Sequence, residues 1–320
     1  MPRPRRPALR SPVQCPVARA DDAAALPADF VPSLNAFTVD VEDYFQVTAF
    51  ETTISRTTWD DLPSRVVEST QRLLSLLARH DVRGTFFVLG WVARKFPGLV
   101  REIQSAGHEI GSHSFWHRLI YTQTPAEFRA DLRQSKQVLE DITGNPVTAF
   151  RAPSFSITRR SLWALQVLVE EGFTTDSSVF PTRHDRYGIP GARPDIHTLE
   201  TPAGPLVEFP PSVVRWSCVA LPAGGGGYFR LYPYPLTRGL LGHINRREHR
   251  PFMFYVHPWE VDPEQPRVGV GSPWSRFRHY VNLASTERKL DRLLREFPCG
   301  AMADVLATRV TPSPLAETAA

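Results

Sequence analysis

The sequence predicts an α/β fold in which parallel strands alternate with helices. Short apolar runs with the β-branched and aromatic composition of buried strands occur at residues 36–39, 85–89, 108–111 and 147–150. Stretches with apolar residues at helical spacing separate them, at residues 63–80, 91–106, 125–143 and 158–172. Repeated strand–helix units of this length are typical of parallel strands covered by helices. An open doubly wound sheet and a barrel give the same pattern, so periodicity leaves both architectures open.

The helix at residues 125–143 has the clearest boundaries. Thr124 is a suitable N-cap, Glu127 follows three residues later, and Gly144 ends the helix. Beyond residue 180 the pattern is less regular, with two more strands, a helix and a possible final strand expected at residues 206–209, 252–257, 286–297 and 301–306. A four-glycine run at residues 224–227 lacks the strand–turn–helix context of a nucleotide-binding loop, so we expect a flexible loop there.

Composition favours one globular domain between two disordered tails. The chain has 320 residues and is 42% hydrophobic, which is enough for a sizeable core. Five arginines precede the first acid, Asp21, and without them the net charge of +4 becomes −1. A basic body that binds nucleic acid is therefore not expected. We expect a disordered, basic, proline-rich leader at residues 1–34, one domain at residues 35–307 and a disordered tail at residues 308–320.

Cysteine usage and hydropathy indicate the compartment. Cys15, Cys218 and Cys299 are scattered and form no CxxC pair, so neither a disulfide framework nor a structural zinc site is expected. Prolines and acids interrupt the segment in which a secretory signal would lie, and no apolar run is long enough to span a membrane. The prediction is a cytoplasmic protein without a membrane span. Its oligomeric state is left open.

Two groups of candidate metal ligands follow strands. Asp40, Glu42 and Asp43 end the first strand, where three carboxylates repel one another unless a cation or hydrogen bonds hold them. His113 and His117 are four residues apart, a spacing that in a helical turn lets both imidazoles reach one metal. Two histidines and one carboxylate leave coordination positions open, as in catalytic zinc sites.

Three further polar residues end later strands. Arg151 begins the segment RAPSF, Asp176 follows the next strand, and His257 follows a late apolar strand. Each alone is more often structural than functional. Together with the acids and the histidine pair they lie at the same end of successive strands, where active sites of parallel α/β folds form.

These segments in this order resemble the motifs of the polysaccharide deacetylases, the NodB-homology or carbohydrate esterase family four. The segments HSFWH and RAPSF match its H-[ST]-x-x-H and R-x-P-x-[YF] motifs, and YVH approximates its L-x-H motif. The first motif departs, with Asp-Val-Glu-Asp in place of two adjacent aspartates, and the fourth lacks its usual tryptophan. The segments GHEIG, HDRYG, FYVHPWEVDP and RHY look like the subfamily encoded with exosortase-linked exopolysaccharide clusters.

The resemblance implies an incomplete or distorted (β/α) barrel and a divalent metal, zinc in the first place with cobalt or another divalent ion as alternatives. It assigns His113 and His117 as metal ligands, with either Glu42 or Asp43 as the third. On an extended strand Glu42 faces the same side as Asp40, which favours Glu42. Asp40 would be the general base and Arg151 the residue that holds and orients it. His257 would be the general acid, oriented or tuned by Asp176.

The implied reaction removes acetyl groups from N-acetylated sugars of a polysaccharide or its lipid-linked precursor in exopolysaccharide biosynthesis. Two alternatives stay open: an allantoinase-like amidohydrolase acting on a small amide, and a catalytically dead carbohydrate-binding module. The full set of His113, His117, Arg151 and His257 argues against the dead module. Five aromatic residues are candidates for stacking on sugar rings, although core packing explains any one of them better: Trp116, Phe155, Trp216, Tyr228 and Trp259.

Overall fold

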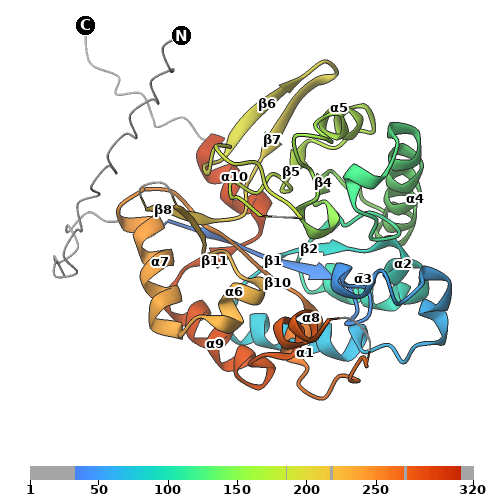
Figure 1. Cartoon of the computed structure of the whole chain (residues 1–320). Helices are drawn as coiled ribbons and strands as arrows, with labels where there is room; N and C mark the ends of the chain where they lie inside the picture. Colours follow the sequence, from blue (N-terminus) through green and yellow to red (C-terminus); the bar gives the residue numbers. More distant parts are fainter. Residues whose placement is uncertain (1–32, 185, 217–218, 270–271, 311–320) are drawn as a thin grey trace, which may run out of the picture.

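The computed structural model describes residues 33–184, 186–216, 219–269 and 272–310. Most of the predicted leader and tail, together with Cys15 and Cys218, lies outside these residues. Within them the chain forms a mainly parallel sheet in the order β10-β1-β2-β3-β4-β5-β7-β6, with β11 paired to β1 (Figure 1). Because β10 and β6 stand at opposite ends of this order and do not pair in the described chain, the sheet stays open. The predicted α/β class and the incomplete barrel are therefore confirmed.

The strands of this sheet run parallel except β6, which forms an antiparallel hairpin with β7. Their bounds are β1 (Asn35–Val41), β2 (Thr85–Val88), β3 (Glu109–Ser112), β4 (Ala149–Phe150), β5 (Thr175–Asp176), β6 (His197–Thr201), β7 (Gly204–Glu208), β10 (Met253–Val256) and β11 (Cys299–Gly300). A separate antiparallel pair consists of β8 (Val213–Trp216) and β9 (Val219–Pro222).

Helices surround the sheet and connect its strands (Figure 1). The α-helices are α1 (Val66–Arg79), α2 (Gly90–Lys95), α3 (Pro97–Ser105), α4 (Pro125–Thr143), α5 (Trp163–Glu170), α6 (Gly226–Leu231), α7 (Tyr234–Arg246), α8 (Pro273–Tyr280), α9 (Leu283–Glu296) and α10 (Met302–Val310). Short 3₁₀ turns are η1 (Thr48–Phe50), η2 (Arg56–Asp61), η3 (Ile120–Thr122), η4 (Pro153–Phe155) and η5 (Pro258–Val261). In the described chain, no helix combines the length and apolar character needed to cross a bilayer.

Strand β1 shows how alternation places the candidate site. All seven of its residues are buried. Phe37, Val39 and Val41 belong to the large apolar core. Because side chains alternate along a strand, Thr38 and Asp40 face the other side of the sheet, where both contact Arg151. The strand therefore holds apolar packing on one face and carries polar chemistry on the other.

Helix α4 confirms the predicted capping pattern. The Thr124 side chain accepts the Glu127 backbone N–H, and the Glu127 carboxylate accepts the Thr124 backbone N–H at 2.8 Å. This capping box satisfies donors that the first helical turn leaves without partners. At the other end Gly144 adopts a left-handed conformation with φ of 67°, which glycine tolerates best.

Three predicted elements were wrong. The helix predicted at residues 91–106 is two helices, because Pro97 begins α3 after Phe96 leaves helical geometry. Helix α10 (Met302–Val310) occupies the region where a strand at residues 301–306 is predicted. The glycine run is no free loop, since Gly225 pairs with Tyr255 beside β10 and Gly226 begins α6. A Cβ on Gly225 would lie 1.9 Å from the Tyr255 carbonyl oxygen, so this close approach requires glycine.

Candidate active site

Glu42, His113 and His117 form a buried cluster that can hold a cation. One ligand atom from each lies within 4.8 Å of the other two. The Glu42 Oε2 atom lies 2.7 Å from Nε2 of His117, yet it is a buried oxygen without a hydrogen-bond partner. A buried carboxylate oxygen without a hydrogen bond is costly, and a divalent ion between these side chains would satisfy it. The residues therefore fit a two-histidine, one-carboxylate metal site.

The chemistry of the side chains also suits a metal. Nδ1 of His113 lies 2.8 Å from the Arg151 carbonyl oxygen and must carry the proton, so Nε2 is left with its lone pair. Burial lowers the pKa of His113 to about 4, which keeps its imidazole in the neutral, ligating form. For Glu42, burial raises the pKa, but the neighbouring His117, His257 and His113 together outweigh this and bring the pKa to about 2.

The loop that carries the histidine pair is not the helical turn that the spacing suggested. Ser114 and His117 adopt left-handed backbone conformations, with φ of 65° and 51°. The Asp131 carboxylate on α4 accepts the backbone N–H groups of Phe115 at 2.6 Å and Trp116 at 3.2 Å. These contacts fold the loop back, and the two imidazoles meet with ring centres 5.3 Å apart. The histidines converge as predicted, but through a strained loop anchored by Asp131.

Asp43 has a different environment from Glu42. Its carboxylate accepts the Ser64 hydroxyl at 2.5 Å and the backbone N–H groups of Tyr44, Arg65 and Val66. It therefore caps the start of α1. Burial raises the pKa of Asp43 to about 6. Of the two acids kept open as the third ligand, the structure places only Glu42 with the histidines.

Asp40 and Arg151 form a buried ion pair beside this cluster. The Arg151 side chain is fully buried, and its Nη1 donates to Asp40 Oδ1 at 2.6 Å and to Thr38 Oγ1 at 2.8 Å. Its Nη2 donates to Ser177 Oγ at 3.0 Å. The predicted contact between Arg151 and Asp40 is thus present. It fixes the Asp40 carboxylate at the end of β1.

His257 faces the two acids of β1 from the end of β10. Its Nε2 lies 3.8 Å from Asp40 Oδ2 and 3.8 Å from Glu42 Oε1. On the other side of the ring, Nδ1 lies 2.6 Å from Glu260 Oε1. Burial lowers the pKa of His257, but the Glu260 hydrogen bond and the charges of Glu42, Glu260 and Asp40 raise it to about 9.

The partner of His257 is Glu260, not Asp176, which corrects the expectation from the sequence. Glu260 Oε2 accepts from Arg230 Nε at 2.6 Å, and the Arg230 charge helps to hold the pKa of Glu260 below its ordinary value despite burial. Asp176 instead accepts the Ser178 hydroxyl and lies beside its cross-strand partner Glu208. Burial of this carboxyl pair raises the pKa of both groups.

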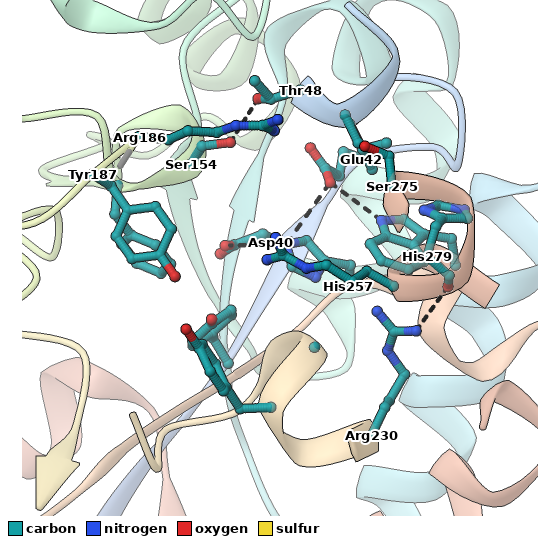
Figure 2. Close-up of a pocket in the computed structure, with 18 of the residues that line it drawn as sticks. Asp40, Glu42, Thr48, Ser154, Arg186, Tyr187, Arg230, His257, Ser275 and His279 are labelled. Atoms are coloured by element: carbon teal, nitrogen blue, oxygen red, sulfur yellow. Dashed lines mark hydrogen bonds and ion pairs between the residues drawn. The ribbon is translucent and has the colours of Figure 1, made fainter. Parts of the chain in front are cut away.

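A pocket of about 420 Å³ brings the site together (Figure 2). Its lining includes Asp40, Glu42, His113, His117 and His257. Of the aromatic residues proposed to stack on sugars, Phe155, Tyr228 and Trp259 line the pocket. Trp116 does not line it and packs against Trp59, and the Trp216 side chain lies outside the described part of the structure.

Sequence reasoning missed three residues of this site. Glu260 was visible as the third residue after His257, in the segment HPWE, but the resemblance pointed to Asp176 instead. Asp131 gave no signal, because an acid in an amphipathic helix is ordinarily solvated. Trp274 lines the pocket mouth and is 64% exposed, on a helix that apolar spacing did not reveal.

Comparison with known proteins agrees with this geometry. Residues 51–173 match the family model described as Polysaccharide deacetylase. This central part of the chain is therefore similar to polysaccharide deacetylases. Residues 177–307 match a domain of unknown function (DUF3473). The site draws on both parts, because His113, His117 and Arg151 lie in the polysaccharide deacetylase region, and His257 and Glu260 lie in the second region.

Curated polysaccharide deacetylases resemble part of the chain. A peptidoglycan-N-acetylglucosamine deacetylase of Bacillus cereus is 34% identical over 110 residues, which are 34% of this chain and 39% of that protein. A chitooligosaccharide deacetylase of Azorhizobium caulinodans is 32% identical over 112 residues, 35% of this chain and 50% of that protein. The chain therefore spans about half or less of the length of these relatives.

A solved structure resembles the chain over nearly its full length. It comes from Mycobacterium smegmatis and is described as a "putative polysaccharide deacetylase". The match has a TM-score of 0.59 at 20% identity and covers 93% of this chain and 99% of the other. The shared feature is the fold, including the region beyond residue 177.

Proposed function

We propose that this chain is a metal-dependent hydrolase that removes N-acetyl groups from the sugars of a polysaccharide or of its lipid-linked precursor. The observation that carries this proposal is the convergence of Glu42, His113 and His117 with Asp40 and His257 in one pocket. Relatives named as deacetylases of N-acetylglucosamine-containing glycans support the reaction class.

Glu42, His113 and His117 are the proposed ligands of a divalent ion, with zinc the first candidate and cobalt a second. When bound, such an ion polarises the amide carbonyl and makes a water molecule acidic near neutral pH. Hydrogen bonds from the surrounding protein orient two of these ligands. The Arg151 carbonyl oxygen accepts from Nδ1 of His113, and the Trp259 indole N–H donates to Glu42 Oε1 at 3.2 Å.

Asp40 is the proposed general base. Its carboxylate lies at the edge of the cation cluster, 3.8 Å from the His257 ring and paired with Arg151. In this role Asp40 accepts the proton of the attacking water, and Arg151 keeps the acceptor oxygen aimed at the pocket.

His257 is the proposed general acid. An amine is a poor leaving group unless its nitrogen is protonated, and Nε2 of His257 points toward the pocket from the side opposite Glu260. In this role His257 donates its Nε2 proton to the departing amine nitrogen, and Glu260 holds Nδ1. We propose Glu260 as the positioning residue, in place of Asp176.

We further propose that the enzyme acts in exopolysaccharide biosynthesis and belongs to the subfamily encoded with exosortase-linked clusters. Two segments that suggested this subfamily, at residues 184–188 and 278–280, contribute His184, Arg186, Tyr187, Arg278 and His279 to the pocket lining. The position of these segments at the pocket supports a role in binding the glycan.

Acetate release from a panel of N-acetylated oligosaccharides, with a small amide such as allantoin included, tests the proposal. Zinc-loaded protein is expected to release acetate from oligosaccharides and leave the small amide intact. Hydrolysis of the small amide alone would favour the amidohydrolase alternative. Glycan binding without acetate release would indicate a binding module.

A further inference from the structure

The mouth of the pocket carries arginines that the catalytic residues do not use. Arg186 and Arg278 both line the pocket and are exposed. Among the described residues, neither guanidinium has a hydrogen bond or an ion pair to another side chain. Arg230 differs, because it is buried and paired with Glu260. Figure 2 shows the Arg186 side chain extended beside Ser154 and Thr48, across the pocket from Arg230.

The charges of the pocket are distributed unevenly. Its acidic lining residues are Asp40 and Glu42, which lie at the inner end, one paired with Arg151 and the other in the cation cluster. Toward the rim, Arg186 and Arg278 are exposed and line the pocket, and the described lining there contains no acidic side chain. At the inner end, Arg151 neutralises Asp40 and a bound cation would neutralise Glu42. The rim, in contrast, has an excess of positive charge.

Helix α8 adds an aromatic surface next to one of these arginines. Trp274 is 64% exposed although it lines the pocket, and Arg278 follows one helical turn later on the same face. Its indole is therefore accessible from the pocket, and aromatic rings stack on the apolar faces of sugars. Arg276 points elsewhere, because it lines a different depression and not this pocket.

We propose that this rim binds a negatively charged glycan: Trp274 stacks on a sugar next to the N-acetylated residue, and Arg186 and Arg278 bind a carboxylate or phosphate group that the glycan carries. The inference rests on the proposed deacetylase function and adds the charge of the substrate to it. Guanidinium groups bind both kinds of anion through paired N–H donors. A uronic acid unit and a diphosphate-linked precursor are two sources of such a group.

Three matched substrates test the inference: a neutral N-acetylglucosamine oligosaccharide, one of equal length with a uronate neighbour, and one with a diphosphate at its reducing end. Acetate release is measured with zinc-loaded protein. We expect a higher kcat/KM for an anionic substrate, mainly through a lower KM, with the preference weakening at high salt. The uronate and diphosphate arms identify the source of the anion.

Substitutions of the rim arginines test whether they cause the preference for anionic substrates. Arg186→Gln and Arg278→Gln are each expected to reduce the ratio of anionic to neutral kcat/KM by about tenfold, the effect of one lost charge-assisted hydrogen bond. Arg276→Gln, two residues away on the same helix, should leave the ratio unchanged. Equal kcat/KM for all three substrates, or an equal loss in Arg276→Gln, would overturn the inference while the deacetylase function stands.

A binding measurement distinguishes failure of the rim inference from failure of the deacetylase function. Calorimetric titration with de-N-acetylated uronate and diphosphate oligosaccharides measures anion binding without catalysis. If no substrate releases acetate but anionic glycans bind and Arg186→Gln and Arg278→Gln weaken that binding, the rim inference holds and the deacetylase function fails. Absence of preferential anion binding in this arm overturns the inference.

Discussion

Nδ1 of His257 lies 2.6 Å from Oε1 of Glu260, three residues further along the chain. The same carboxylate accepts from Arg230 on α6, and the Arg230 guanidinium lies over the Trp259 ring. Glu260 thereby fixes the orientation of the imidazole. Its Nδ1–H faces Glu260, and its Nε2 faces Asp40 and Glu42. The general acid proposed here is therefore positioned by a residue that follows its own strand, and not by Asp176 on β5.

Replacing Glu260 with Gln is expected to reduce turnover by roughly tenfold or more, because His257 loses the carboxylate that orients it. A general acid works only while protonated, so activity falls as pH rises through the pKa of His257. Since Glu260 raises that pKa, the variant should lose activity at lower pH than the wild type. A pH–rate profile of kcat measures the displacement.

Two substitutions serve as references for this profile. Glu264→Gln alters an exposed acid in the same segment and should leave the profile in place. Asp176→Asn separates the structural assignment from the one suggested by the sequence. If Asp176→Asn moves the alkaline limb and Glu260→Gln does not, then Asp176 is the partner that matters.

Replacing His113 or His117 with Ala should remove bound metal and activity together, because each supplies one of three ligand atoms. His243→Ala provides the control, since that histidine is exposed on α7, far from the cluster in sequence, and its imidazole pairs with Glu248. Elemental analysis of protein purified without chelator is expected to find about one divalent ion per wild-type chain. Full metal content in both ligand variants would contradict the site.

Glu42→Gln and Asp43→Asn should have opposite effects. Loss of the Glu42 charge is expected to release the metal, because its carboxylate faces the histidines. Asp43→Asn should keep the metal and lower the free energy of unfolding by about 1–3 kcal/mol, because the carboxylate caps α1 and accepts the Ser64 hydroxyl. Metal analysis and chemical denaturation of the two variants distinguish them, and loss of metal from Asp43→Asn would reverse the assignment.

Asp131→Ala is expected to weaken metal binding by about 10–100-fold although Asp131 does not touch the cluster. Without this carboxylate, the backbone N–H groups of Phe115 and Trp116 lose their acceptor, and the loop that brings His113 and His117 together loosens. Asp131→Asn keeps one acceptor oxygen and should retain more affinity. Competition with a chromogenic chelator measures both, and unchanged affinity in Asp131→Ala would show that the loop holds its shape unaided.

The sequence predicted the features that depend on local pattern. Buried strands, the capping box of α4 and the polar ends of β1, β4 and β10 follow from short-range periodicity and turn chemistry. Alternation along the first strand favoured Glu42 over Asp43 but left both open, and the structure places Glu42 with the histidines. The convergence of the histidines was predicted for a helical turn, whereas a left-handed loop produces it.

Features that depend on distant contacts escaped prediction. The helix formed by residues 226–231 follows Gly225, which packs against the β10 backbone, and no local pattern reveals this contact. Asp131 looks like any acid on a helix until the loop at Phe115 lies against it. The family motif predicts Asp176 as the partner of His257, whereas Glu260, three residues further along the chain, contacts its Nδ1.

The central claim is that the Asp40 carboxylate, next to a site for one metal ion, activates water for deacetylation. The variant Asp40→Asn tests this claim most directly. The substitution keeps the size of the side chain but cannot accept the proton. Acetate release and bound metal are measured on the same preparations of wild type and variant, with an N-acetylated oligosaccharide as substrate. We predict that the variant keeps its metal and turns over about 10²–10⁴-fold more slowly, and that a chelator abolishes the wild-type activity. Unchanged turnover in Asp40→Asn, or full activity in metal-free wild type, would contradict the account.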